Sequence, residues 1–301
     1  MNSDVLWLRA HVVRAIRNFF WDRGFLEVET PLLIPANAPE EYIDPLAALP
    51  WQLQTSPELC MKRLLCRGHK RLFQISHCWR ADERGFRHLS EFTMLEWYRA
   101  DSDYNALMAD CEELLQHVAT ACLAEAPFYR HQSCRIDPFE SWVIISVQEA
   151  FWRFSNTNVW ECLKKGIYEE ILTEMIEPAL AGFSAPVLMT DYPAELAALS
   201  RLKPGQTELA ERFELYLGGL ELANGFSELN DPLEQRRRFE NANRLRIGVG
   251  RGALPLPERF LEELGSLPPS AGIAMGVDRL VMLAAGADTI DEVVAFTPEQ
   301  L

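Results

Sequence analysis

Residues 73–99 combine side chains that can bind a phosphorylated ligand. An apolar run and a run rich in β-forming residues flank a charged loop, which is typical of a β-hairpin. Because side chains alternate between the two faces of a strand, Phe92, Glu96 and Tyr98 lie on one face. Such a row could hold a nucleotide base on the ring and a cation on the carboxylate, while Arg80 at the loop entrance donates two parallel hydrogen bonds to a phosphate. The alternative is an amphipathic hairpin whose charged loop is simply solvated.

A second stretch, residues 212–231, carries carboxylates and an amide between apolar side chains. Gly218-Gly219 separates two alternating runs and predicts another hairpin. Burying several carboxylates without cations is costly, so carboxylates that face inward would imply metal ions or a cationic substrate. Oxygen ligands of this kind suit magnesium together with substrate phosphates.

The register of this second stretch presents a difficulty. Asn224 and Glu228 have one parity and Glu221 has the other, so a regular strand cannot direct all three toward one site. A bulge near Asn224-Gly225 would resolve the conflict, because glycine inside a strand often marks a bulge. The alternative is a solvated acidic edge.

A third signal is Asp278-Arg279, where a strand containing glycines enters a helix that we expect Asp278 to cap. A helix N-terminus and a neighbouring arginine can hold a phosphate together. The dipeptide is common at helix starts, so by itself this signal is weak.

Composition limits the classes of partner. A chain of 301 residues can form a full core, as one domain or as one domain with a small insertion. The net charge of −15 argues against broad binding to nucleic acid, with a local exception in the basic residues between 62 and 71. The start of the chain lacks the features of a signal peptide and no apolar run reaches membrane-spanning length, so we expect a cytoplasmic protein that binds no membrane. Seven cysteines without a Cys-x-x-Cys pattern indicate idle thiols.

Other elements must position these groups. Apolar spacing predicts a helix over residues 4–23 and a strand over 25–28. Ser56-Pro57 begins a second helix over residues 57–67. Ser102 or Asp103 caps a third helix.

The segment between residues 126 and 185 is the least informative. A capping-box pattern predicts a helix from Ser146, and a second helix covers about residues 159–175. Together they would form a small helical insertion, followed by a short strand over residues 186–189.

In this order the segments resemble the class II aminoacyl-tRNA synthetases. The unit that ends Gly24-Phe-Leu-Glu-Val-Glu-Thr-Pro31 resembles motif 1, residues 73–99 resemble motif 2, and residues 271–283 resemble motif 3. Glu91-Phe-Thr-Met-Leu-Glu-Trp-Tyr98 resembles the lysyl-tRNA synthetase version of motif 2. Between motifs 2 and 3, Glu221-Leu-Ala-Asn-Gly-Phe-Ser-Glu-Leu229 resembles the lysyl-tRNA synthetase run Glu-x-x-Asn-Gly-Phe-x-Glu-Leu. The resemblance implies a single α+β catalytic domain over residues 1–301, with a mostly antiparallel sheet flanked by helices, in a homodimer.

The resemblance also implies residue roles. For ATP these are Arg80, Asp82, His88, Phe92 and Arg279. For the amino-acid substrate they are Glu58, Glu96, Tyr98, Asn224, Glu228 and Ala274. For Mg²⁺ they are Glu214 and Glu221, and Arg80 is the catalytic residue because it would bridge the substrate carboxylate and the α-phosphate.

Two features narrow the resemblance to the elongation factor P–(R)-β-lysine ligase family. The catalytic region begins at about residue 4, which leaves no room for an anticodon-binding domain. Leu222-Ala223 and Ala274 stand where lysyl-tRNA synthetases usually have Ile-Gly and Gly, and an added methyl group is worth about 1–3 kcal/mol of discrimination. The resemblance implies an ATP-dependent ligase that activates (R)-β-lysine, or lysine, as an acyl-adenylate and transfers it to a lysine of elongation factor P.

Motif 2 departs from the family pattern. The usual Arg-x-Glu becomes Arg80-Ala-Asp82, and His-Asn-Pro-Glu-Phe becomes His88-Leu-Ser-Glu-Phe92, which alters the expected contacts with ATP. Two alternatives therefore stay open. One is a stand-alone amino-acid-activating enzyme with a tRNA or small-molecule acceptor, and the other is an inactive synthetase paralogue that acts as a binding or regulatory subunit.

Overall fold

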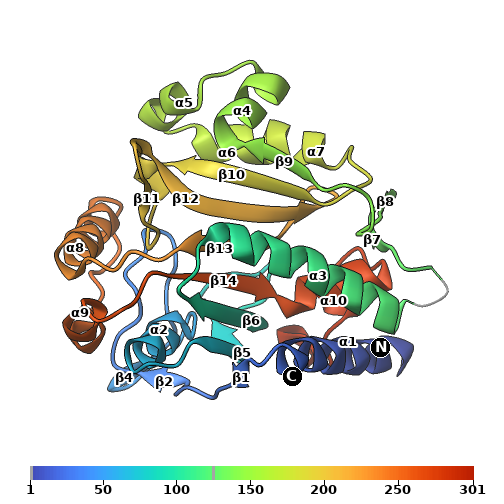
Figure 1. Cartoon of the computed structure of the whole chain (residues 1–301), viewed down its shortest axis with the longest axis horizontal. Coiled ribbons are helices and arrows are strands. Elements are labelled where there is room, and N and C mark those ends of the chain that lie inside the picture. Colours follow the sequence, from blue (N-terminus) through green and yellow to red (C-terminus); the bar gives the residue numbers. More distant parts are fainter. Residues whose placement is uncertain (1–2, 124–125) are drawn as a thin grey trace.

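A large mixed sheet forms the centre of the computed structural model, which describes residues 3–123 and 126–301 (Figure 1). Within these residues it has nine strands, in the order β1 (Leu26–Glu27), β5 (Arg71–Trp79), β6 (Glu91–Ala100), β14 (Ser270–Gly276), β13 (Leu220–Ser227), β12 (Gln206–Leu217), β10 (Val187–Pro193) and β9 (Val143–Ser146), with β11 (Leu202–Lys203) beside β12. Only the β1–β5 and β10–β9 pairs are parallel. The expected α+β fold with a mostly antiparallel sheet is confirmed.

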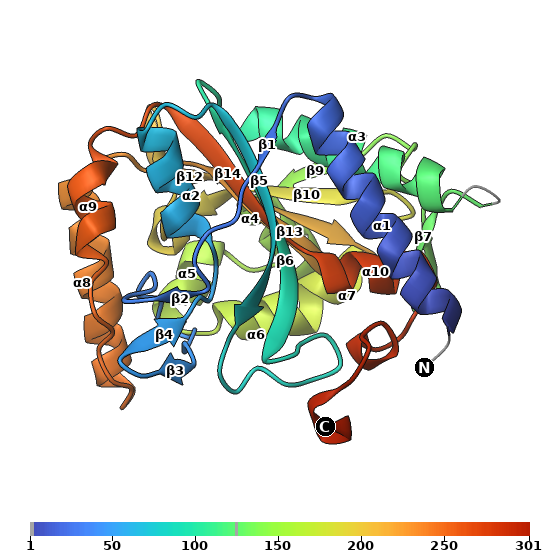
Figure 2. The same cartoon turned by 90° about the horizontal axis from the view of Figure 1, so that it is seen from below.

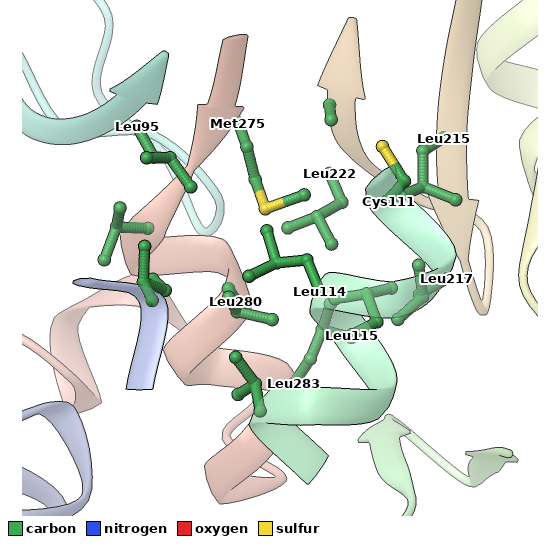
Figure 3. Close-up of a cluster of buried hydrophobic side chains, with 14 of the residues drawn as sticks. Leu95, Cys111, Leu114, Leu115, Leu215, Leu217, Leu222, Met275, Leu280 and Leu283 are labelled. Atoms are coloured by element: carbon green, nitrogen blue, oxygen red, sulfur yellow. The ribbon is translucent and has the colours of Figure 1, made fainter. Parts of the chain in front are cut away.

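Three helices cover one face of the sheet, namely α1 (Ser3–Asp22), α3 (Tyr104–Cys122) and α10 (Val277–Ala285). Figure 3 shows the packing, in which Leu114 of α3 and Leu280 of α10 meet Leu222 and Met275 from the strands. The odd-numbered residues of β6, such as Leu95, point into this core. The alternate residues of the central strands are therefore left for the opposite face.

The opposite face is bordered at its two ends by other helices. One group is α2 (Glu58–Cys66), α8 (Pro232–Gly248) and α9 (Glu258–Leu264). The other is α4 (Val147–Ser155), α5 (Val159–Lys165), α6 (Tyr168–Ile171), the π-helical turn η1 (Leu172–Ile176) and α7 (Glu177–Leu180), which lie over β10 and β9 (Figure 1). Small sheets are formed by β2 (Leu33–Ile34), β4 (Trp51–Leu53) and β3 (Ala47–Ala48), and by β7 (Tyr129–His131) and β8 (Cys134–Ile136).

Several local predictions are confirmed. Both hairpins form, β5 with β6 and β12 with β13, and the second turns at Gly218-Gly219 with φ of +58° and +76°. Gly219 has a further constraint, because a Cβ atom there would lie 2.4 Å from the Glu177 carbonyl oxygen. Asp103 caps α3, and Ser146 caps α4.

Other local predictions were wrong. The single helix over residues 159–175 is broken at Gly166, whose φ of +68° ends α5. The strand after residue 186 does not end at Asp191 but continues past it through an irregularity in the pairing. The segment between residues 126 and 185 contains β7, β8 and β9 as well as helices, and its status as an insertion stays a prediction.

Asp278 does not cap α10, because the helix begins after Gly276 without a side-chain cap. The Asp278 carboxylate is buried and instead accepts hydrogen bonds from the Arg9 guanidinium at 2.6 Å and the Thr93 amide at 2.7 Å. It thereby joins α10 to α1 and β6.

All seven cysteines are free thiols, as expected. Across residues 3–123 and 126–301, every helix is too short or too polar to cross a membrane.

Candidate active site

Two rows of paired residues, which include several charged and polar side chains, cross the face of the sheet opposite α1, α3 and α10. Glu96 of β6 pairs with Ala274 of β14, which pairs with Asn224 of β13, which pairs with Glu214 of β12. The neighbouring row is Tyr98, Gly272, Phe226 and Arg212. Antiparallel register thus gathers residues more than a hundred positions apart into one site.

A bulge resolves the parity conflict on β13. Leu215 pairs with Ala223 and Tyr216 pairs with Glu221, so Leu222 is the extra residue. The bulge shifts the alternation by one position, and Glu221 and Asn224 line the same cavity. The predicted position of the bulge, at Asn224-Gly225, was wrong.

Gly225 is a glycine for a different reason. The pairing of β13 with β14 is regular around it. A Cβ atom at Gly225 would lie 2.7 Å from the ring of Phe213. The small residue therefore allows close packing on the core side.

Two adjoining cavities lie over these rows. The first, of about 260 Å³, contains Arg80, His88, Phe92, Glu221 and Arg279 among its lining residues. The second, of about 160 Å³, contains Glu58, Glu96, Tyr98, Phe226 and Gly272. Five residues line both cavities, namely Glu40, Arg80, Met94, Asn224 and Ala274. The Arg80 side chain therefore stands at their junction.

Cationic and aromatic groups dominate the first cavity. The Arg80 guanidinium lies 5.1 Å from the centroid of the Phe92 ring, and its buried Nε atom has no hydrogen-bond partner. Arg279 Nη1 donates to the Glu221 carbonyl oxygen at 2.7 Å, and Nη2 lies 2.6 Å from His88 Nε2. Burial and the Arg279 charge lower the pKa of His88 to about 4, so the imidazole is neutral and can accept this hydrogen bond.

The structure separates the two acidic residues that follow Arg80. Asp82 is exposed, has φ of +62°, and lines neither cavity. Glu83 lines the first cavity, and its carboxylate lies 3.8 Å from the Arg80 guanidinium. A contact between Asp82 and ATP stays a prediction, and Glu83 is the better placed of the two.

A buried carboxylate dominates the second cavity. Glu96 is 1% exposed and accepts hydrogen bonds from Ser56 Oγ at 2.5 Å and from the Tyr98 hydroxyl at 2.7 Å. Burial, with the nearby Glu58 charge, raises the pKa of Glu96 to about 7. A cationic partner would stabilise the ionised form of this carboxyl group.

Lys62, the first of the basic residues between 62 and 71, is buried beside this cavity and does not form part of a basic surface patch. Its ammonium is buried and forms ion pairs with Glu58, on the same helix, and with Glu228 Oε2 at 2.5 Å. Burial lowers the pKa of Lys62, but the two carboxylates outweigh this effect and raise it, so the group remains charged. Burial also raises the pKa of Glu228, and Lys62 opposes that shift.

The two residues expected to bind magnesium differ in availability. Glu214 already accepts hydrogen bonds from Arg212 at 2.7 Å and from the Tyr216 hydroxyl at 2.6 Å. The Glu221 carboxylate forms an ion pair with Arg279 at 3.6 Å, but burial and the Glu214 charge outweigh the nearby arginines and raise the pKa of Glu221 to about 6. The described part of the chain has no cluster of three or more His, Cys, Asp or Glu side chains able to hold a metal ion. Magnesium binding at this pair stays a prediction.

Sequence reasoning missed three side chains of the site. Lys62 had a usable signal, because it is a charge among buried apolar residues of α2 such as Leu59, Met61 and Leu65. Arg212 lies on β12 opposite Phe226 of β13, and its Nε atom donates to Asn224 Oδ1 at 3.1 Å. Glu40 comes from a loop without periodicity, so only the fold reveals it.

Comparisons with known proteins agree with this geometry. The family model for class II tRNA synthetases (D, K and N) matches residues 1–300. Proteins named elongation factor P–(R)-β-lysine ligase from Hamiltonella defensa subsp. Acyrthosiphon pisum (strain 5AT) and Sodalis glossinidius (strain morsitans) are each 38% identical over 97% of this chain and 94% of their own length. The protein of the same name from Proteus mirabilis (strain HI4320) is 38% identical over 96% of this chain and 93% of its own. The family match over the whole catalytic region, together with these relatives, shows that the chain belongs to the class II tRNA synthetase family (D, K and N).

Proposed function

We propose that this protein is an ATP-dependent ligase that activates (R)-β-lysine as an acyl-adenylate and transfers the acyl group to a lysine of elongation factor P. The observation that carries the proposal is the position of Arg80 at the junction of the two cavities. A guanidinium can bind oxygen atoms of two anions at once. It would hold the α-phosphate of ATP beside the carboxylate of the amino acid.

In the first step, a carboxylate oxygen of the amino acid attacks the α-phosphorus, and the bond to pyrophosphate breaks. Arg80 would stabilise the charge that develops on the phosphoryl oxygens. The Phe92 ring would stack on adenine, and Arg279, supported by His88, would bind the γ-phosphate. Positioning is the main contribution of these groups, since both reactants are bound side by side.

The second cavity suits the substrate's amino groups. Glu58 and Glu96 line it with carboxylates, and Tyr98 supplies a hydroxyl that donates to Glu96. Glu228 is not among the lining residues, but Lys62 holds its carboxylate beside Gly272, which is one of them. Asn224 Oδ1 accepts from Arg212, which leaves the amide nitrogen to donate to the substrate carboxylate. The Ala274 methyl lies between Glu96 and Asn224 in register and would exclude an amino group placed as in α-lysine.

Magnesium would bind at Glu221, with Glu214 as a second ligand if its bond to Arg212 is exchanged. The raised pKa of Glu221 supports this assignment, because a divalent ion would supply the missing positive charge. When bound, magnesium neutralises phosphate charge and favours departure of pyrophosphate.

In the second step, the deprotonated amine of the acceptor lysine attacks the carbonyl carbon of the adenylate. The bond between this carbon and the phosphate oxygen breaks, AMP leaves, and the amine releases one proton. The product is an amide.

A homodimer is the proposed assembly. Large apolar side chains are exposed on α1, β1, β2 and β4, which lie together along the bottom of Figure 1 and toward the viewer in Figure 2. They include Trp7, Trp21, Leu26, Leu33 and Trp51. A patch of this kind marks a protein interface, and Trp21→Glu should shift the molar mass measured by light scattering from dimer to monomer.

The test of the proposed function is amino-acid-dependent ATP–pyrophosphate exchange with (R)-β-lysine, α-lysine and amino acids that lack a side-chain amine. We expect exchange with (R)-β-lysine above all others. Transfer from the adenylate is then compared for elongation factor P and for tRNA. Absence of exchange with any diamine, or transfer only to tRNA, would refute the proposal.

A further inference from the structure

We infer that Lys62 is a positioning residue, whose ammonium fixes the spacing of the two carboxylates that receive the substrate's amino groups. The inference rests on the proposed function, because it assigns the origin of substrate discrimination in the same site. Lys62 itself is not expected to touch the substrate. Its two partners, Glu58 and Glu228, are expected to do so.

The ion pairs of Lys62 are buried. The Lys62 side chain is 1% exposed and the Glu228 side chain is fully buried, so solvent does not screen their interaction. Glu58 and Lys62 belong to α2, whereas Glu228 follows β13. One ammonium therefore ties a helix to the sheet across the amine side of the site.

The buried Oε1 atom of Glu228 has no hydrogen-bond partner. The Oε2 atom lies 2.5 Å from the Lys62 ammonium in an ion pair, although its geometry also falls outside that of a regular hydrogen bond. A Cβ atom on Gly272 would lie 2.4 Å from the Oε1 atom and 2.1 Å from the Tyr98 ring, so this oxygen lies beside two residues that line the amine cavity. Lys62 thus holds one oxygen of the carboxylate, and the other stays without a hydrogen-bond partner beside the cavity.

The charges around the second cavity nearly balance. Its charged lining residues (Glu40, Glu58, Glu96, Arg80 and Arg212), together with Glu228 and Lys62, give four carboxylates and three cationic groups, a formal charge of −1. A diamino acid brings two ammonium groups and one carboxylate and neutralises this charge. Without Lys62 the carboxylates would repel one another and separate, or one of them would take up a proton.

The test compares Lys62→Met with a matched control, Lys70→Met. Methionine keeps an unbranched chain of similar length but lacks the ammonium, which lies 5.1 Å from the centroid of the Phe226 ring. Lys70 is an exposed lysine that forms an ion pair with Asp101 at 3.0 Å, so its replacement should leave exchange unchanged. Exchange kinetics are measured with (R)-β-lysine, α-lysine and ornithine. The amino groups of α-lysine are one carbon further apart than those of the other two, and (R)-β-lysine differs from ornithine in the distance of its amino groups from the carboxylate.

For Lys62→Met we expect KM for (R)-β-lysine to rise about tenfold or more, with kcat changed less than about threefold and KM for ATP unchanged. The preference among the three diamines should shrink toward equality. If Lys62 had a purely structural role, Lys62→Met would lower the free energy of unfolding without changing the preference among the three diamines. Folded Lys62→Met with the wild-type KM and preference would overturn the inference.

Two further measurements keep the test decisive. If Lys62→Met does not fold, Lys62→Met combined with Glu228→Gln removes both buried charges, and we expect a folded protein without diamine discrimination. Retained discrimination in this double variant would overturn the inference. Propylamine added to Lys62→Ala should lower KM by restoring an ammonium, and an equal effect on wild type would count against the inference.

Failure of the proposed function is recognised separately. If the wild-type protein shows no exchange with any diamine, the ligase proposal falls. Calorimetric binding of the three diamines to wild type and Lys62→Met then decides on Lys62. Weaker and less selective binding to the variant supports the inference, whereas equal binding or no binding to either protein overturns it.

Discussion

Gly272→Ala should damage the amine side of the site, because a methyl group has no space between Tyr98 and Glu228. Gly272 lies in β14 directly opposite Tyr98 of β6. Its added Cβ atom would lie 2.1 Å from Tyr98 Cε1 and 2.4 Å from Glu228 Oε1. Non-bonded carbon atoms normally approach to about 3.5–4.0 Å, so the ring or the strand must move by about 1 Å or more.

The size of the effect follows from what must move. Tyr98 is 3% exposed, and Lys62 holds Glu228, so neither side chain has free space to enter. Overpacking of this kind costs about 1–3 kcal/mol of folding free energy, which is about 2–6 °C in Tm for a domain of this size. Moving the ring also breaks the bond between the Tyr98 hydroxyl and Glu96, and a displacement of about 1 Å in a site can cost about a hundredfold in activity.

Thermal unfolding and ATP–pyrophosphate exchange test this prediction together. Gly248→Ala is the matched control, because its Cβ atom would have no neighbour within 4 Å. Tyr98→Ala removes the closest overlap, so the losses of stability in Gly272→Ala and Tyr98→Ala should be less than additive in the double variant, and activity should not return. Gly272→Ala with wild-type Tm and wild-type KM for the diamine would refute the reasoning.

Three other predictions concern charge. Arg80→Lys keeps the charge but loses the planar fork, so kcat/KM in the exchange assay should fall about a hundredfold; a fall of less than threefold, about 0.7 kcal/mol, would contradict the junction role. Burial raises the pKa of Glu96 to about 7, so KM for the diamine should fall as pH rises through 7. The free energy of unfolding of the unliganded protein should decrease from about pH 4.5 to 7, because the folded state holds the Glu96 proton more tightly than the unfolded state does. If Glu96→Gln showed the same decrease of the free energy of unfolding with pH, this assignment to Glu96 would be wrong. The Arg99 guanidinium donates to the buried Asp110 carboxylate at 2.5 and 2.6 Å, so Asp110→Ala should lower the free energy of unfolding, measured by chemical denaturation, by about 3–5 kcal/mol. A decrease below about 1 kcal/mol would show that Arg99 finds another partner.

Features that depend on neighbours in the chain could be predicted well. The alternation of residues 92–98 places Phe92, Glu96 and Tyr98 on the cavity side of β6, as expected. Gly218-Gly219 forms the predicted turn, and Asp103 caps the predicted helix. In each case a few adjacent residues supply the physical cause, which is side-chain parity, positive φ or a local hydrogen bond.

Other features depend on which strand pairs with which. The bulge at Leu222 appears in the pairing of β13 with β12, and no property of Leu222 alone indicates it. The contact between Asp82 and ATP stays a prediction, but the turn after Arg80 places Glu83, and not Asp82, among the residues that line the cavity. The direction of a side chain in such a loop is decided by backbone torsion angles, for which residue type is a weak guide.

From the sequence by itself one can determine the order of the three motifs, the two hairpins and the kinds of charge available, because these follow from local spacing and from residue type. Only the tertiary structure decides that Arg80 lies where two cavities meet and that Lys62 is buried between Glu58 and Glu228. Both depend on contacts between segments far apart in the chain. The charge of a buried group is set by the neighbours that folding brings to it, and those neighbours are absent from its own stretch of sequence.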